Sequence, residues 1–181
     1  NIVCSTNFNR NTIVGGVNNC ITACAKSFIG GGDTNTVSGT YAVISGGRQN
    51  SILLAATAST ISGGYCNTIS CSSRSVIGGG RRNTVSGNVA HTTISGGYCN
   101  TISSQVGTIS GGRANTSSGS YSFIGGGCTN TSSSLSASIV GGVKNLAQGI
   151  YSTIGGGICN NACNTTCDCL ALGSVVVGGV G

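Results

Sequence analysis

Short apolar runs alternate with clusters of small polar residues along the chain at a regular interval. The pattern Ile-x-Gly-Gly-x-x-Asn occurs ten times, and successive copies begin 15 to 17 residues apart. The starting residues are Ile13, Ile29, Ile44, Ile61, Ile77, Ile94, Ile109, Ile124, Ile139 and Ile154. A register of this kind is typical of repeat architectures, in which each unit packs only against its neighbours.

Each repeat contains two short runs that favour β-strands. With the isoleucine as position 0, position −1 is Thr, Val, Phe or Ser, and position +7 is Ser or Thr in seven copies. Position +8 is Ile or Val in the first six copies. Small turn residues follow each run. Nothing recurs at the helical period, and glycine pairs would interrupt a helix, so one repeat predicts one coil of two strands and two turns.

Stacking these coils predicts an all-β fold, a parallel β-solenoid or narrow β-roll of about ten coils, with equivalent residues about 4.8 Å apart. We expect the isoleucines to fill the interior and the glycines to supply positive φ or a close backbone approach at one corner. The chain divides into a lead-in or partial coil (1–12), the repeat domain (13–160), and a Cys-rich irregular coil with a final partial repeat (161–181). Neither end has the polar cap that solenoids need, which favours continuation in a longer protein or stacking on another subunit.

Position +6 is asparagine in every copy. In a parallel stack each side-chain amide is expected to hydrogen bond the amide of the next coil, as in cross-β structures. This predicts a structural ladder of ten residues: Asn19, Asn35, Asn50, Asn67, Asn83, Asn100, Asn115, Asn130, Asn145 and Asn160.

Composition argues against several classes of protein. The chain has 33 Gly but no Pro and no glycine at every third position, so it is not collagen. The net charge of +6 is spread thinly, whereas nucleic-acid binding favours a dense basic face, so we expect no nucleic-acid partner. No apolar run has the length of a membrane span.

Groups for catalysis are scarce. The only acids are Asp33 and Asp168, and His91 is the single histidine. The glycine pairs lack the Gly-Lys-Ser/Thr context of a phosphate loop. We therefore expect no catalytic residue, no bound metal, no cofactor and no enzymatic activity.

Cysteine is the most distinctive chemistry of the chain. Eleven cysteines leave at least one free or bonded to another chain. Cys66, Cys99 and Cys159 share position +5, but Cys66 and Cys99 would lie about 10 Å apart, too far for an intrachain disulfide. The cysteines could form disulfides or interchain bonds, pack as small apolar residues, or bind a metal. The spacing of the C-terminal cluster, Cys159, Cys163, Cys167 and Cys169, matches no zinc pattern. The candidates for disulfides are Cys66, Cys99, Cys159, Cys163, Cys167 and Cys169.

Position +4 holds a second pattern, in which arginine and tyrosine alternate from coil to coil. Neighbours about 5 Å apart could form cation–π pairs along the solenoid. The alternation is either a solvated turn that follows a two-coil duplication or a contact stripe for a glycan or an acidic host surface. The stripe consists of Arg48, Tyr65, Arg81, Tyr98 and Arg113.

Units such as Ser122-Phe-Ile-Gly-Gly-Gly-Cys-Thr-Asn-Thr131 and Ser152-Thr-Ile-Gly-Gly-Gly-Ile-Cys-Asn160 resemble the head repeats of trimeric autotransporter adhesins and similar repeats of viral and phage fibre proteins. The resemblance covers residues 11–160 and implies a left-handed parallel β-roll, a homotrimer around a threefold axis, and a role in attachment. Those heads are rich in Ala and poor in Cys, unlike this chain.

We therefore expect a structural fibre protein that forms a stiff projection or attachment head on a cell or virus particle. Its expected partners are copies of itself, as a trimer or an end-to-end stack, and a glycan or host receptor. One alternative is a self-assembling extracellular filament. Another is an ice-binding solenoid with Thr at −1 and +7.

Overall fold

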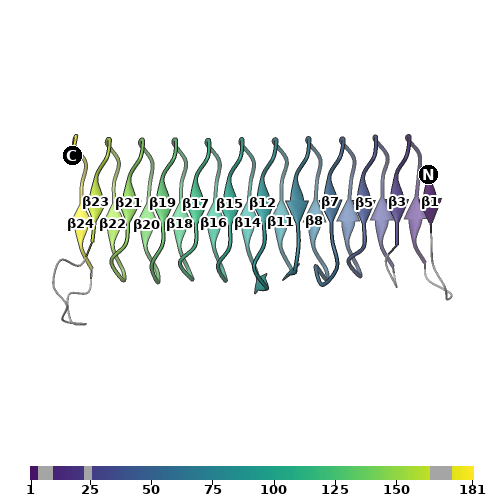
Figure 1. Cartoon of the computed structure of the whole chain (residues 1–181), viewed down its shortest axis with the longest axis horizontal. Coiled ribbons are helices and arrows are strands. Elements are labelled where there is room, and N and C mark those ends of the chain that lie inside the picture. Colours follow the sequence, from purple (N-terminus) through teal and green to yellow (C-terminus); the bar gives the residue numbers. More distant parts are fainter. Residues whose placement is uncertain (4–9, 23–25, 164–172) are drawn as a thin grey trace.

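The computed structural model describes residues 1–3, 10–22, 26–163 and 173–181. Over these ranges the chain winds as a parallel β-solenoid of about ten coils, with the two termini at opposite ends of a rod (Figure 1). The predicted all-β solenoid is confirmed. The described part of the chain has no helix with the length and apolar character of a membrane span.

One sheet, which we call sheet A, contains the strands at positions +7 and +8. Its eleven strands pair in parallel and follow one another along the rod. They are β1 (Ile2–Val3), β3 (Cys20–Ile21), β5 (Thr36–Val37), β7 (Ser51–Ile52), β9 (Thr68–Ile69), β12 (Thr84–Val85), β15 (Thr101–Ile102), β17 (Thr116–Ser117), β19 (Thr131–Ser132), β21 (Leu146–Ala147) and β23 (Asn161–Ala162).

The second large sheet, sheet B, contains the strands at positions −1 and 0. It also has eleven parallel strands among the described residues. They are β2 (Thr12–Ile13), β4 (Phe28–Ile29), β6 (Val43–Ile44), β8 (Thr60–Ile61), β11 (Val76–Ile77), β14 (Thr93–Ile94), β16 (Thr108–Ile109), β18 (Phe123–Ile124), β20 (Ser138–Ile139), β22 (Thr153–Ile154) and β24 (Val175–Val176).

Equivalent residues of successive coils are direct partners in both sheets. Ile29 of β4 pairs with Ile44 of β6, and Thr84 of β12 pairs with Thr101 of β15. The chain before the first full repeat already belongs to sheet A, because β1 pairs with β3, and sheet B resumes at β24 beside β22.

The interior is a thin double layer of side chains between the two sheets. The position 0 isoleucines from Ile29 to Ile154 are fully buried, as predicted. Burying one such side chain contributes about 1.5–3 kcal/mol as an upper estimate. Toward the C-terminal end, buried Ser117 and Ser132 replace the Ile and Val of position +8. Their hydroxyls have partners: Ser117 Oγ bonds Ser122 Oγ, and Ser132 Oγ donates to the Ala137 carbonyl at 2.8 Å.

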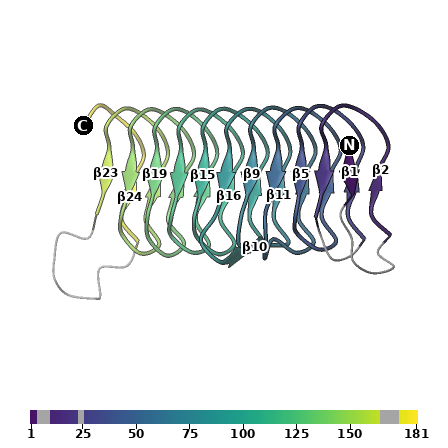
Figure 2. The same cartoon turned by 45° about the vertical axis from the view of Figure 1, so that its right-hand side comes forward.

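The two sheets meet at two unlike corners. The glycine corner, positions +2 to +5, forms a uniform row of arcs in Figure 2. The variable corner runs from position +9 to position −2 of the next coil and takes up every difference in coil length. It also holds a two-stranded parallel sheet, β10 (Ser72–Ser73) and β13 (Val89–Ala90).

Candidate functional site on the glycine corner

The conformation of the glycine corner repeats coil after coil. Position +3 is a glycine with positive φ, between 83° and 92° in the ten repeats. Position +5 also has positive φ in every repeat, although it is never glycine; its value is 54° at Asn18 and 58° at Cys159. The residues at +4 lie between these two positions and form parallel bridges from one coil to the next.

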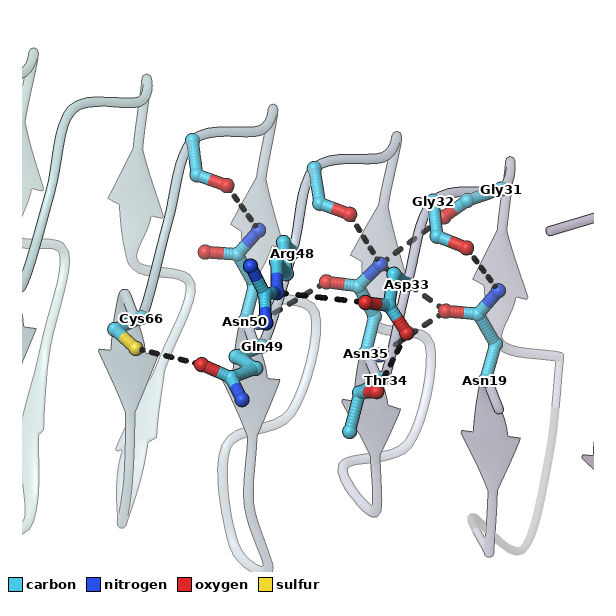
Figure 3. A network of polar contacts seen from close by, with 12 residues as sticks. Asn19, Gly31, Gly32, Asp33, Thr34, Asn35, Arg48, Gln49, Asn50 and Cys66 are labelled. Carbon is cyan, nitrogen blue, oxygen red and sulfur yellow. Dashed lines mark hydrogen bonds and ion pairs between the residues drawn. The ribbon is translucent and has the colours of Figure 1, made fainter. Parts of the chain in front are cut away.

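The asparagine at +6 bonds main-chain groups of its own coil and of the next coil. The Asn35 N–H donates back to the Oδ1 of Asn19 at 3.0 Å (Figure 3). The Asn35 Nδ2 donates to the Gly31 carbonyl of its own coil at 3.0 Å and to the Gly47 carbonyl of the next coil at 2.9 Å. Its Oδ1 in turn accepts the Asn50 N–H at 3.0 Å, so one side chain bonds three main-chain groups in two adjacent coils.

The ladder differs from the expected amide-to-amide bonding. Among the described asparagines, a direct hydrogen bond between side-chain amides joins only two pairs. These are Asn35 Nδ2 to Asn19 Oδ1 and Asn160 Nδ2 to Asn145 Oδ1, each at 3.1 Å. The hydrogen bond that recurs at every step is instead the one that the backbone N–H of each asparagine donates to the Oδ1 of the preceding asparagine. Among the described residues this N–H donates to no carbonyl, and a buried unpaired N–H costs about 1–3 kcal/mol, so the Oδ1 of the preceding asparagine stabilises it.

Asn1 belongs to the same ladder, although it was not among the ten predicted residues. Its Nδ2 donates to the Gly16 carbonyl at 3.0 Å, and its Oδ1 accepts the Asn19 N–H at 3.1 Å. The signal was present in the sequence, because Asn1-Ile2-Val3 repeats the asparagine, strand and inward-residue order of Asn19-Cys20-Ile21.

The glycine corner presents the predicted arginine and tyrosine side chains in one continuous row. The Arg48 guanidinium lies 5.6 Å from the centre of the Tyr65 ring, and that of Arg81 lies 5.4 Å from it. Arg81 also lies 5.6 Å from the Tyr98 ring, and Arg113 lies 5.9 Å from it. All five residues of the Arg/Tyr stripe thus form one series of cation–π contacts. Their role in binding stays a prediction.

Asp33 extends this row at one end. Its Oδ2 lies 3.4 Å from Arg48 Nε (Figure 3), and the two side chains are 46% and 62% exposed. An ion pair this exposed contributes about 0–1 kcal/mol to stability. The pair does, however, offset the charge of Arg48. This contact was not predicted, although the place of Asp33 at +4 of the preceding coil was the signal for it.

Arg82 adds a further cation beside the stripe. It occupies position +5, is exposed, and follows Arg81 directly. A hydrogen bond with the Tyr98 side chain raises the pKa of Arg82 above its ordinary value. The adjacent pair of arginines was visible in the sequence but was not assigned to the stripe.

The cysteines among the described residues are all free thiols: Cys20, Cys66, Cys71, Cys99, Cys128, Cys159 and Cys163. Cys66 donates from its Sγ to Gln49 Oε1 at 3.3 Å (Figure 3). Cys167 and Cys169, two of the candidates for disulfides, lie outside the described residues, as do Cys4 and Cys24. Bonds between cysteines of different chains stay a prediction.

His91 lies away from the stripe. His91 has a φ of 60° at the variable corner, and Asp168 lies outside the described residues. Within the part of the chain that the structure describes, no group of three His, Cys, Asp or Glu side chains gathers as a metal site would require, and no pocket is present.

Comparison with known proteins identifies no relative of this chain. No protein-family model matches the chain, and no curated protein matches its sequence.

Proposed function

We propose that this protein is a non-enzymatic structural element of a fibre, and that it forms a stiff projection or attachment head at the surface of a cell or virus particle. The observation that carries this proposal is the continuity of hydrogen bonding along the rod. Both sheets, the glycine corner and the asparagine ladder each join every coil to the next. Bending such a rod would strain all of these contacts together.

Cryo-electron microscopy of the purified full chain tests this proposal. Straight rods, alone or bundled side by side, are the expected result. Continuous filaments with rolls stacked end to end would instead support the self-assembling filament. Compact particles of irregular shape would contradict both. A non-reducing gel of the same sample shows whether cysteines join the chains.

We further propose left-handed coils and a homotrimer in which sheet B faces the threefold axis. Handedness and threefold packing both follow the resemblance to adhesin heads. The outward residues of sheet B add a physical reason, because they include Phe28, Val43, Val76 and Phe123. Val76 is 39% exposed and Phe123 is 38% exposed. A narrow coil rich in glycine encloses little apolar volume, so burial of this face would add stability.

Removing apolar side chains from sheet B tests the trimer. We expect the double variant Val76→Thr, Phe123→Thr to weaken the assembly by about a hundredfold or more, since each lost contact is worth about 1.5–3 kcal/mol. Light scattering at several concentrations measures the mass. The matched control is Leu146→Thr, which removes an outward apolar side chain from sheet A. A wild-type protein that stays monomeric, or an equal effect of the control, would contradict this packing.

A second candidate function is ice binding, and sheet A favours it. Its outward position +7 carries a hydroxyl in seven successive coils, at Thr36, Ser51, Thr68, Thr84, Thr101, Thr116 and Thr131. The interruptions at Cys20, Leu146 and Asn161 all fall outside this run. Thermal hysteresis measured on the purified chain tests this candidate, and its absence at high protein concentration would exclude it.

A further inference from the structure

We infer that the Arg/Tyr stripe is a binding site for an extended anionic polysaccharide that carries one carboxylate or sulfate on every second sugar. This inference rests on the proposed role in attachment and names the chemistry that the fibre would recognise. Three features of the stripe carry it: the orientation of the rings, the balance of charge, and the spacing of the arginines.

The first feature is that the tyrosine ring faces are already occupied. Arg48 and Arg81 come from the coils on either side of Tyr65, and both lie over its ring. A sugar ring therefore cannot stack on Tyr65, which makes a neutral glycan held by aromatic stacking a poor fit. The tyrosines instead hold the guanidinium planes in a fixed direction. An Arg held in this way loses less entropy when it binds an anion.

The second feature is the uncompensated positive charge. Asp33 pairs with Arg48, but among the described residues no carboxylate pairs with Arg81, Arg82 or Arg113. All three side chains are exposed. Guanidinium groups bind carboxylate and sulfate through charge-assisted, bidentate hydrogen bonds. The arginines of position +4 are also confined to the middle of the rod, because this position is Val17 and Asp33 before them and Cys128, Val143 and Ile158 after them.

The third feature is the spacing along the rod. Tyrosine separates successive arginines at +4, so Arg48, Arg81 and Arg113 recur every second coil, about 10 Å apart. An extended sugar residue advances its chain by about the height of one coil, so an acidic group on every second sugar matches this interval. Phosphates of stacked nucleic acid follow one another at about 3.4 Å per strand, which leaves most of them between arginines.

The test measures binding of the full chain to hyaluronan oligosaccharides, in which every second sugar carries a carboxylate, by calorimetry at low and at physiological salt. We expect Arg81→Gln, Arg113→Gln to lower the affinity by about tenfold or more, since two charge-assisted contacts are lost. The matched control is Arg10→Gln, Arg74→Gln, which removes two exposed charges elsewhere and is expected to change the affinity less than about twofold.

A second variant separates the effect of arginine orientation from the effect of arginine charge. Tyr65→Leu, Tyr98→Leu keeps all the arginines but frees them from the rings, so we expect a loss of about tenfold in affinity with the net charge unchanged. Equal losses from the stripe variant and its charge-matched control would overturn the inference. Tighter binding of neutral dextran, or of oligothymidylate, than of hyaluronan would overturn it as well. Straight rods that fail to bind would reject this site alone, whereas compact particles would reject the fibre.

Discussion

The two corners of the coil follow opposite rules. At the glycine corner, the number of residues between the isoleucine at position 0 and the asparagine at +6 is the same in all ten repeats. At the variable corner, coils of 15, 16 and 17 residues are accommodated side by side. Both corners use positive φ at non-glycine residues, for example at Arg82 in the glycine corner and at Tyr121 in the variable corner.

The difference lies in how each corner satisfies its main chain. Side-chain amides buried at fixed positions complete the glycine corner, so an extra residue would move each amide away from its three partners. At the variable corner, backbone groups bond each other or a buried serine hydroxyl, as the Gly39 carbonyl bonds Ser27 Oγ, and these contacts differ between coils. Added residues can therefore open a wider loop there without breaking the sheets. Insertions that change the length of a coil are therefore tolerated at the variable corner only, because the glycine corner fixes the register of the repeats.

Inserting one residue into each corner should give the largest contrast. A glycine inserted between Arg113 and Ala114 is expected to cost about 5 kcal/mol, because the Asn115 amide loses its partners and the bridges of position +4 shift. A glycine inserted between Ser134 and Leu135 lengthens a 15-residue coil to a length found elsewhere in the chain, and we expect less than about 1 kcal/mol. Urea unfolding followed by circular dichroism measures both. Similar losses would contradict the comparison.

Removing one polar side chain from each corner should give the next largest contrast. Asn100→Ala leaves the Asn115 N–H and the Gly96 carbonyl without a partner, whereas the Gly112 carbonyl still accepts the Tyr98 N–H. We therefore expect a loss of about 3 kcal/mol. Ser152, at the variable corner, is fully buried, and its hydroxyl has no hydrogen-bond partner among the described residues. Ser152→Ala should therefore be neutral or stabilise by up to about 1 kcal/mol.

Hydrogen exchange adds a second measurement to this pair. Because a solenoid is stabilised mainly by contacts between neighbouring coils, a defect at Asn100 should weaken protection most in the coils on either side of it. A uniform loss of protection along the whole rod would show that the ladder acts globally, and would contradict the local account.

The two glycines of one corner should give the smallest contrast. Gly97, at +3, has φ 92°, and an added Cβ would collide with the Gly112 carbonyl oxygen and stand 2.6 Å from Asn100 Nδ2. Gly97→Ala should cost about 3 kcal/mol, from overpacking and from the positive φ. At Gly96, in position +2, an added Cβ would meet nothing within 4 Å. Gly96→Ala should change stability by less than about 0.5 kcal/mol in the isolated chain. Thermal unfolding below the concentration of assembly compares the two.

Much of this geometry follows from the repeat, because parallel stacking without a shift places each residue beside its own copy. For this reason Ile44 could be assigned to the core, and Tyr65 could be placed between Arg48 and Arg81. The same reasoning could not show what the asparagine bonds, since an amide has several donors and acceptors and the direction of the nearby N–H groups was unknown. That direction depends on the positive φ at +5, where the residue types share no common feature.

The sequence by itself determined the period, the parallel stacking, the buried isoleucines and the alternation of arginine with tyrosine, because all of these depend only on residue spacing. Only the tertiary structure decided which glycine of each pair is required and which main-chain groups the asparagine amide bonds. These depend on the path of the backbone between the strands. There the sign of φ turns each peptide toward one neighbouring coil or the other, and so selects its partner.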